Sequence, residues 1–263
     1  MMLEVKDLVI RFHDRIGGEA VHGVSFDMKA GERLGIVGES GAGKTLTALA
    51  ITRLLKEETT SLSGSIHFMG KDMLKASNRE MRDIRGKDIG FIFQDPVASL
   101  NPLMPVGPQI EEALLLHTDL SKSERQERVL QAIKDVDLPE PEVTMKKYPH
   151  QLSGGQCQRV MIASALICHP ALLIADEPTT ALDVTVQTQI LKLLKRKNEE
   201  ENVGILYISH DLSLVRRLCT RVIVMYNGNI VETGDVEQVF TNPREEYTQH
   251  LIAAIPTRSK RYV

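Results

Sequence analysis

The sequence predicts an α/β fold with a mainly parallel sheet and a helical insertion in its middle. Short apolar runs, typical of buried strands, alternate with segments of helical spacing. A glycine-rich segment at residues 38–45 directly follows one of these runs. From about residue 95 to 165 the pattern changes to helix and loop.

Three segments before the glycine-rich stretch predict strands. Residues 3–12 alternate partly between apolar and polar side chains and predict an edge-type strand, and residues 21–28 predict a second. A turn at Ala30-Gly31 leads to the short apolar run 34–37, which predicts a buried central strand.

After the glycine-rich stretch, residues 45–55 have the composition and spacing of a helix, and residues 65–69 and 89–93 predict further strands. Within the insertion, Ser121 and Glu124 form a capping box. We expect it to open a helix that runs to about Val136 and buries that residue together with Val129 and Ile133.

The C-terminal half returns to strands. Residues 160–168 predict a buried helix, followed by a buried strand at 171–175. Two more strands are expected at 203–208 and 222–225, and a helix at 186–197 precedes them.

The composition is that of a globular α/β protein. Of 263 residues, 42% are apolar, 4% are aromatic and none is Trp. A net charge of −3 gives no electrostatic indication of nucleic-acid binding. The three cysteines, Cys157, Cys168 and Cys219, lack metal-ligand spacing and are typical of reduced thiols in the cytosol.

Neither a signal peptide nor a membrane span is expected. The N-terminus has no basic region followed by an apolar one. The longest apolar stretch, residues 160–175, is interrupted by Ser164 and His169-Pro170 and falls short of the roughly 20 residues a span needs.

The glycine-rich segment matches the phosphate-loop pattern G-x-x-x-x-G-K-[ST] in full. Glycines let backbone N–H groups converge on phosphate oxygens, and the following helix N-terminus adds positive potential. The lysine can reach the β- and γ-phosphates, and the threonine can ligate Mg²⁺. A plain glycine-rich strand–helix turn is the alternative. The candidate residues are Gly38, Glu39, Ser40, Gly41, Ala42, Gly43, Lys44 and Thr45.

A second element carries two carboxylates. Residues 172–175 form an apolar run that ends in Asp176 and Glu177, and α/β sheets bind ligands at the carboxyl ends of strands. Asp176 is the expected Mg²⁺ partner, and Glu177 is placed to polarise the attacking water. Alone, such a strand end is often a solvated turn.

A second glycine pair lies in Ser153-Gly154-Gly155-Gln156, ahead of an apolar helical run. Ser153 occupies a helix N-cap position, so its hydroxyl and the two glycine amides are suited to bind a γ-phosphate. A cap that serves only its own helix is the alternative.

The order of these motifs resembles the ATP-binding subunits of ABC transporters over roughly residues 3–256. The resemblance implies a P-loop NTPase (RecA-like) core at 1–94 and 166–240 with an N-terminal antiparallel β subdomain. It also implies an inserted α-helical signature subdomain at 95–165 and a C-terminal tail at 241–263. The motifs that carry it are the phosphate loop, Gln94, Leu152-Ser153-Gly154-Gly155-Gln156, Asp176-Glu177, Ala181-Leu182-Asp183 and Ser209-His210-Asp211.

In that family two subunits face head to tail, and each signature loop closes on the ATP held by the other. The resemblance therefore implies ATP and Mg²⁺ as cofactors. It gives catalytic roles to Glu177, His210 and Gln94, and Mg²⁺ ligation to Thr45, Gln94 and Asp176. Among further nucleotide contacts, Asp183 would communicate between sites and Phe12 would stack on adenine. A core aromatic is the alternative for Phe12, and Cys157 is expected to be a bystander.

Finer motifs resemble the peptide and nickel importer group. Relatives there often carry a later cysteine cluster for an iron–sulfur centre, and this sequence has no cysteine after Cys219, which favours nickel or metal-chelate members. The tail is a looser match, because Glu245-Glu246 replaces the usual His-Pro. The motifs are Phe93-Gln94-Asp95-Pro96, Ser99-Leu100-Asn101-Pro102, Val106-Gly107, Tyr148-Pro149-His150-Gln151 and the tail around Tyr247-Thr248.

The implied function is an ATPase that powers import of nickel, metal chelates or small peptides from the cytoplasmic face of the plasma membrane. The implied partners are a second ATP-binding subunit (identical or homologous), two permease subunits and an extracytoplasmic substrate-binding protein. Residues 99–109 are the expected groove for a permease helix. The alternatives are a soluble ABC-type ATPase acting on nucleic acid or ribosomes, and a generic kinase.

Overall fold

The computed structural model describes residues 1–13, 18–179 and 182–255. Ala181 of the expected Ala181-Leu182-Asp183 motif, and the tail from Pro256, lie outside this range. The chain divides into two compact units, one of Met1–Lys75 with Leu206–Val263 and the other of Ala76–Ile205.

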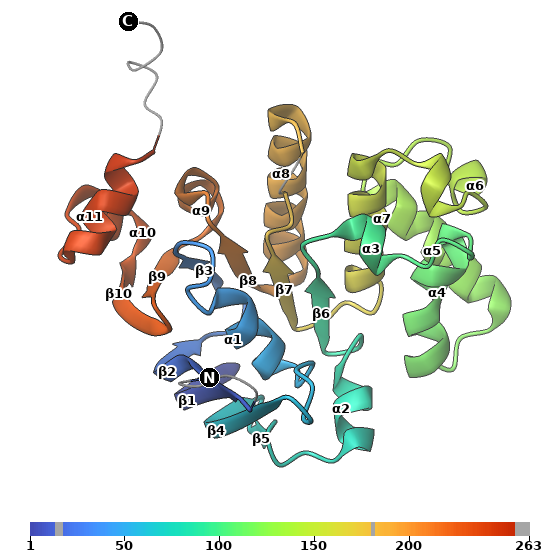
Figure 1. Cartoon of the computed structure of the whole chain (residues 1–263). Coiled ribbons are helices and arrows are strands. Elements are labelled where there is room, and N and C mark those ends of the chain that lie inside the picture. Colours follow the sequence, from blue (N-terminus) through green and yellow to red (C-terminus); the bar gives the residue numbers. More distant parts are fainter. Residues whose placement is uncertain (14–17, 180–181, 256–263) are drawn as a thin grey trace, which may run out of the picture. The chain divides into compact units, whose positions relative to one another are not determined.

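An antiparallel sheet lies in the first unit (Figure 1), with the strand order β2-β1-β4-β5. Leu3 of β1 lies opposite both Met28 of β2 and Phe68 of β4, so β1 is an inner strand and the expectation of an edge strand is wrong. Partial alternation reports which face of a strand is buried and carries no information about its neighbours. The strands are β1 (Leu3–Phe12), β2 (Glu19–Met28), β4 (Thr60–Phe68) and β5 (Lys71–Asp72).

The other strands of the first unit include β9, which pairs with a strand on each side. This strand pairs in parallel with β3 and antiparallel with β10. Asn227 and Gly228 join β9 to β10, both at left-handed φ values of +44° and +76°, as a two-residue hairpin turn favours. The elements are β3 (Arg33–Val37), α1 (Lys44–Ile51), α9 (Leu212–Leu218), β9 (Arg221–Tyr226), β10 (Asn229–Asp235), α10 (Val236–Thr241) and α11 (Glu246–Ala253). Strand β8 (Gly204–Ser209) contains the division between the two units.

The second unit holds a parallel strand pair and most of the helices (Figure 1). Strand β7 is apolar up to its last residue and entirely buried, as the apolar run predicted. The elements of the second unit are α2 (Asn78–Ile84), β6 (Ile89–Ile92), α3 (Pro96–Ser99), α4 (Val106–His117), α5 (Lys122–Asp135), α6 (Pro141–Thr144), a 3₁₀ turn (Pro149–Gln151), α7 (Gly154–Leu166), β7 (Leu172–Asp176) and α8 (Val184–Glu201).

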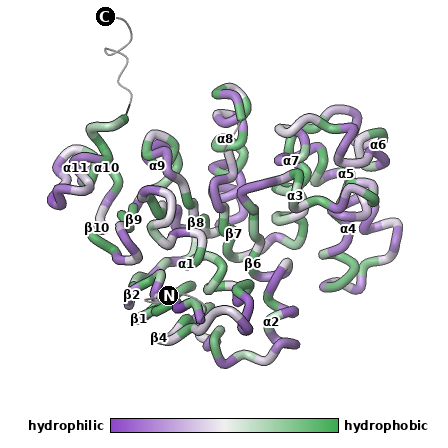
Figure 2. The backbone as a smooth tube through the Cα atoms, in the orientation of Figure 1, coloured by the Kyte–Doolittle hydropathy of each residue, from purple (hydrophilic) through white to green (hydrophobic). Residues whose placement is uncertain are grey.

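Helix α5 confirms the capping-box prediction. Ser121 accepts a hydrogen bond from the Glu124 amide, and the Glu124 carboxylate accepts one from the Ser121 amide. Val129, Ile133 and Val136 are buried as expected. The remainder of the helix is strongly polar, and Figure 2 colours much of α5 as hydrophilic, in contrast to the apolar β7. Burial of one apolar stripe is therefore what holds α5 against its neighbours.

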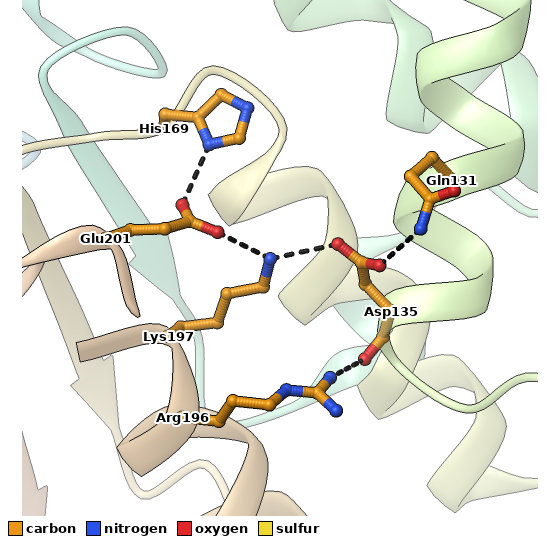
Figure 3. A network of polar contacts seen from close by, with 6 residues as sticks. All are labelled: Gln131, Asp135, His169, Arg196, Lys197 and Glu201. Atoms are coloured by element: carbon orange, nitrogen blue, oxygen red, sulfur yellow. Dashed lines mark hydrogen bonds and ion pairs between the residues drawn. The ribbon is translucent and has the colours of Figure 1, made fainter. Parts of the chain in front are cut away.

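A polar network joins α5 to the end of α8 within the second unit (Figure 3). Lys197 donates to Asp135 at 2.9 Å and to Glu201 at 2.6 Å, and Glu201 also contacts His169 at 2.8 Å. Burial opposes ionisation of Asp135 and Glu201, but the Lys197 ammonium keeps the pKa of both carboxyls below their ordinary values. An ion triad thus fixes α5 against α8.

Among the helices of the described ranges, none combines the length and the hydropathy that a membrane crossing requires.

Candidate functional site

The phosphate loop occupies residues 38–43, between the end of β3 and the start of α1. Gly38, Gly41 and Gly43 have φ values of +151°, +83° and +96°, a region that favours glycine. A Cβ added to Gly38 would lie 2.2 Å from the Met225 carbonyl oxygen. The first glycine of the pattern is therefore required by close packing as well as by backbone conformation.

Lys44 is buried, and its ammonium forms hydrogen bonds with the backbone of the loop that precedes it. Its Nζ donates to the carbonyl oxygens of Gly38 at 2.8 Å and Glu39 at 2.9 Å. Gly43 at the helix N-cap has no side chain to occupy the first amides of α1. These amides and the lysine are the groups that bind phosphate oxygens in such loops.

Gln94 and Glu177 come together in the second unit. The parallel register of β6 and β7 places Ile92 opposite Ala175, so Gln94 and Glu177, each two positions beyond this pair, also face each other. Gln94 Nε2 donates to Glu177 Oε2 at 3.1 Å. The amide oxygen of Gln94 is thereby left available to another donor or to a cation.

Glu177 has a left-handed φ of +46°, which is unfavourable for a residue with a side chain. Asp176, one residue earlier, is only 3% exposed, whereas Glu177 is half-buried. Strained residues of this kind concentrate at functional sites. The turn therefore separates a buried carboxylate from one that reaches toward solvent.

Ser153 caps α7, which begins six residues before the expected start at residue 160. Its hydroxyl accepts from the Gln156 amide at 3.3 Å, and the Gln156 side chain accepts from the Ser153 amide at 3.0 Å. Ser153 and Gly154 are exposed, and space around Gly154 is open for 4 Å. The expected N-cap is confirmed, and the glycine pair forms the first, accessible turn of the helix.

The remaining candidates lie at the ends of elements. Phe12 is half-buried in the last position of β1. His210 is exposed and directly follows β8. Asp183 caps α8 by accepting from the amides of Thr185 and Val186, each at 3.0 Å.

The three expected Mg²⁺ ligands offer a hydroxyl, an amide oxygen and a carboxylate, which are the hard oxygen donors that Mg²⁺ prefers. In the described part of the chain, no group of three or more His, Cys, Asp or Glu side chains is arranged to hold a metal. The donor types of Thr45, Gln94 and Asp176 fit Mg²⁺, which usually keeps several waters and binds substrate phosphates.

Cys157 is buried, and its thiol donates to the Pro149 carbonyl at 3.5 Å. Burial raises the pKa of this thiol, so it is a poor nucleophile.

A complete phosphate loop between a strand and a helix, together with an acidic strand end, defines the chain as a P-loop ATPase. More specifically, it belongs to the ABC transporter family, whose model matches residues 21–180. The expected fold class is confirmed by a solved structure of similar fold, the dimeric post-hydrolysis state of the ATP-binding cassette MJ0796 bound to ADP and Pi. The match has a TM-score of 0.80 and 31% identity over 89% of this chain and 99% of that one.

Two curated relatives cover almost the whole chain. The oligopeptide transport ATP-binding protein OppD of Bacillus subtilis is 49% identical over 259 residues, which are 97% of this chain and 72% of that protein. The peptidoglycan transport ATP-binding protein YejF of Agrobacterium fabrum is 52% identical over 259 residues, but the match spans only 47% of its length. The chain is therefore an ATP-hydrolysing subunit of the transporter class.

One contact to the phosphate loop was missed by the sequence analysis. The hydroxyl of Tyr247 accepts a hydrogen bond from the Glu39 amide at 3.0 Å. The two residues are 208 positions apart, so no local pattern points to this pairing.

Proposed function

We propose that the chain is the ATPase subunit of an importer for peptides or peptide-like solutes. The observation that carries this proposal is the identity of about half of all aligned residues with an oligopeptide transport ATP-binding protein, over 97% of the chain. Nickel or a metal chelate, the other cargo expected from the resemblance, stays a prediction. Cargo is chosen by other subunits in this family, so these residues do not discriminate between the two.

The phosphate loop is proposed to bind ATP through the α1 amides, with Lys44 on the β- and γ-phosphates. Bound Mg²⁺ would supply positive charge that offsets the charge developing on the transferred phosphoryl group. Thr45, Asp176 and the Gln94 amide oxygen are the proposed ligands. Lys44 Nζ donates to the carbonyl oxygens of Gly38 and Glu39, so its ammonium lies within the loop.

Glu177 is proposed to orient the attacking water. The hydrogen bond from Gln94 positions this carboxylate, which is the proposed acceptor of a proton from the attacking water. His210 is proposed to contact the γ-phosphate, Asp183 to respond to the neighbouring site and Phe12 to stack on adenine.

A second subunit is proposed to complete each ATP site through Ser153, Gly154, Gly155 and Gln156. The accessible first turn of α7 and the open space at Gly154 support this role, because an incoming phosphate needs free amides at a helix N-terminus. The similar cassette MJ0796 is described as dimeric with ADP and Pi. Identical and homologous partners both remain compatible with the proposal.

We further propose that residues 95–165 form the helical signature subdomain, between core segments 1–94 and 166–240, followed by the tail 241–263. The segment after Gln94 exposes apolar side chains, with Val97 59%, Leu103 86% and Met104 37% accessible. Such a patch suits a cytoplasmic helix of one of two permease subunits. The complex would also include an extracytoplasmic binding protein, and this chain would lie at the cytoplasmic face of the plasma membrane.

The deciding experiment compares Glu177→Gln with the unaltered protein in an ATPase assay. Glutamine keeps the size of the side chain and its contact to Gln94 but cannot accept a proton, so turnover should fall by at least about a hundredfold while ATP binding persists. Gel filtration with ATP should show a trapped dimer. Undiminished hydrolysis would refute the assigned role.

Copurification tests the coupling. Membrane subunits and a binding protein should accompany the tagged chain, and mass spectrometry of the binding protein's ligand should identify a peptide. Nickel in that position would favour the other cargo, and ribosomes or nucleic acid alone would favour the soluble alternative.

A further inference from the structure

Two residues from the C-terminal part of the first unit form hydrogen bonds with the backbone of the phosphate loop. Tyr247 of α11 accepts the Glu39 amide at 3.0 Å, and the amide of Gly228 donates to the Ala42 carbonyl at 3.2 Å. These two bonds engage Glu39 and Ala42, on either side of the exposed residues Ser40 and Gly41. Both come from segments that follow β8 in sequence.

The Tyr247 ring is itself fixed. It packs against Tyr226, with ring centroids 4.2 Å apart and the planes inclined by 35°. Burial raises the pKa of the Tyr247 phenol above its ordinary value of about 10, so it stays neutral at physiological pH. The phenol oxygen is therefore an acceptor of fixed position.

Helix α11 is anchored through Glu232 of β10. The buried carboxylate accepts the amides of Arg244 at 2.9 Å and Glu245 at 3.2 Å, immediately before the helix starts. Burial opposes ionisation of Glu232, but these backbone donors keep its pKa below the ordinary value. The start of the helix and the position of Tyr247 thus follow from one charge-assisted contact.

Lys44 and Tyr247 bind different backbone groups of the loop, since the lysine donates to carbonyl oxygens and the tyrosine accepts from the Glu39 amide. A bound β- or γ-phosphate competes for the Lys44 ammonium, which would then release the carbonyl oxygens of Gly38 and Glu39. The bond from Glu39 to Tyr247 uses the backbone amide and does not involve the lysine. It is most important when Lys44 has turned to the phosphate.

We propose that Tyr247 is a positioning residue for the ATP site, which holds the Glu39 amide and so keeps the phosphate loop in its binding conformation. The inference rests on the proposed role of this loop in ATP binding. A loop ordered in advance binds its ligand at a lower entropic cost, so the residue should act on affinity.

The test uses the full-length chain and a fluorescent methylanthraniloyl-ATP with Mg²⁺. Tyr247→Phe keeps the ring stack and removes the acceptor, and should raise the dissociation constant about three- to tenfold, the range expected for one hydrogen bond. Tyr247→Ala also removes the ring stack and should raise the dissociation constant further. The matched control is Tyr226→Phe, which takes the other hydroxyl from the stacked pair and should change the constant less than about twofold.

An amide NMR spectrum separates positioning from general destabilisation. In Tyr247→Phe the Glu39 amide proton should move upfield, whereas the amide of Gln249, bonded to Glu245 within α11, should keep its shift. An unchanged dissociation constant, or equal effects of Tyr247→Phe and Tyr226→Phe, would overturn the proposal.

Lys44→Ala distinguishes this failure from failure of the proposed function. If the unaltered protein binds the nucleotide and Lys44→Ala does not, the phosphate loop is the ATP site and only the tyrosine is in question. If the unaltered protein binds none, the ATP-binding function fails first, and the positioning role with it.

Discussion

Replacing Lys197 by Met should destabilise the second unit measurably. The lysine side chain is 11% exposed, and its partners Asp135 and Glu201 are 32% and 21% exposed. Methionine fills a similar volume, so the effect is mainly the loss of two charge-assisted hydrogen bonds. Each contributes about 1.5–3 kcal/mol when fully buried. Partial solvation of both carboxylates reduces this range, and we expect a total loss of about 2–3 kcal/mol.

Thermal unfolding of the full-length chain, followed by circular dichroism, measures this loss. For a protein of this size, each kcal/mol lowers the midpoint by about 2–4 °C, so Lys197→Met should unfold about 4–12 °C earlier. Lys195→Met is the matched control on the same helix. The Lys195 side chain is 51% exposed and its Nζ lies 3.8 Å from Glu199 Oε1, so Lys195→Met should lower the free energy of unfolding by less than about 0.5 kcal/mol.

The pH dependence checks the cause. The pKa values of Asp135 and Glu201 are lowered in the folded state, so their contribution is complete above the unfolded values of about 4 and is lost as pH falls through the folded ones. The gap between Lys197→Met and the unaltered protein should therefore close in acid. A gap that does not narrow as the pH falls below about 4, or a midpoint unchanged at pH 7, would refute the electrostatic reasoning.

Other predictions concern the phosphate loop, the tail and the thiols. Gly38→Ala should lower stability by more than about 3 kcal/mol in thermal unfolding, because its Cβ would meet the Met225 carbonyl oxygen at 2.2 Å. Gly41→Ala, where space is open, should cost only about 1 kcal/mol of backbone strain. Glu232→Gln should destabilise the start of α11 by about 1–2 kcal/mol, which faster amide hydrogen exchange at residues 244–250 would show. Unchanged exchange rates at these residues would mean that the carboxylate does not anchor the helix. Iodoacetamide at neutral pH should label half-buried Cys168 before the two buried cysteines in native protein. Mass spectrometry measures the order of labelling, and a buried cysteine that is labelled first would contradict this prediction.

Local sequence was sufficient for elements with a local cause. The capping box at Ser121 correctly predicted the start of α5, and the apolar run before Asp176 correctly predicted β7. The predicted helix at 45–55 ends earlier, at Ile51. Helix α7 begins earlier than expected because the glycine pair, poor in intrinsic helix propensity, enters the helix behind the Ser153 cap.

The candidate site divides in the same way. Its residue types and spacing are legible as motifs, because phosphate binding needs glycines, a lysine and a helix N-terminus in sequence. The hydrogen bond between Gln94 and Glu177 joins residues 83 positions apart. It follows from the pairing of β6 with β7, which the sequence does not specify.

By itself, the sequence determined the class of protein, the phosphate loop and the acidic strand end, because each depends on residues that are adjacent in the chain. Tertiary structure alone decided that β1 is an inner strand, that Lys197 links α5 to α8 and that Tyr247 holds the Glu39 amide. These pairings join distant segments, and the free energy that selects them comes from burial and hydrogen bonding that exist only once the chain is folded.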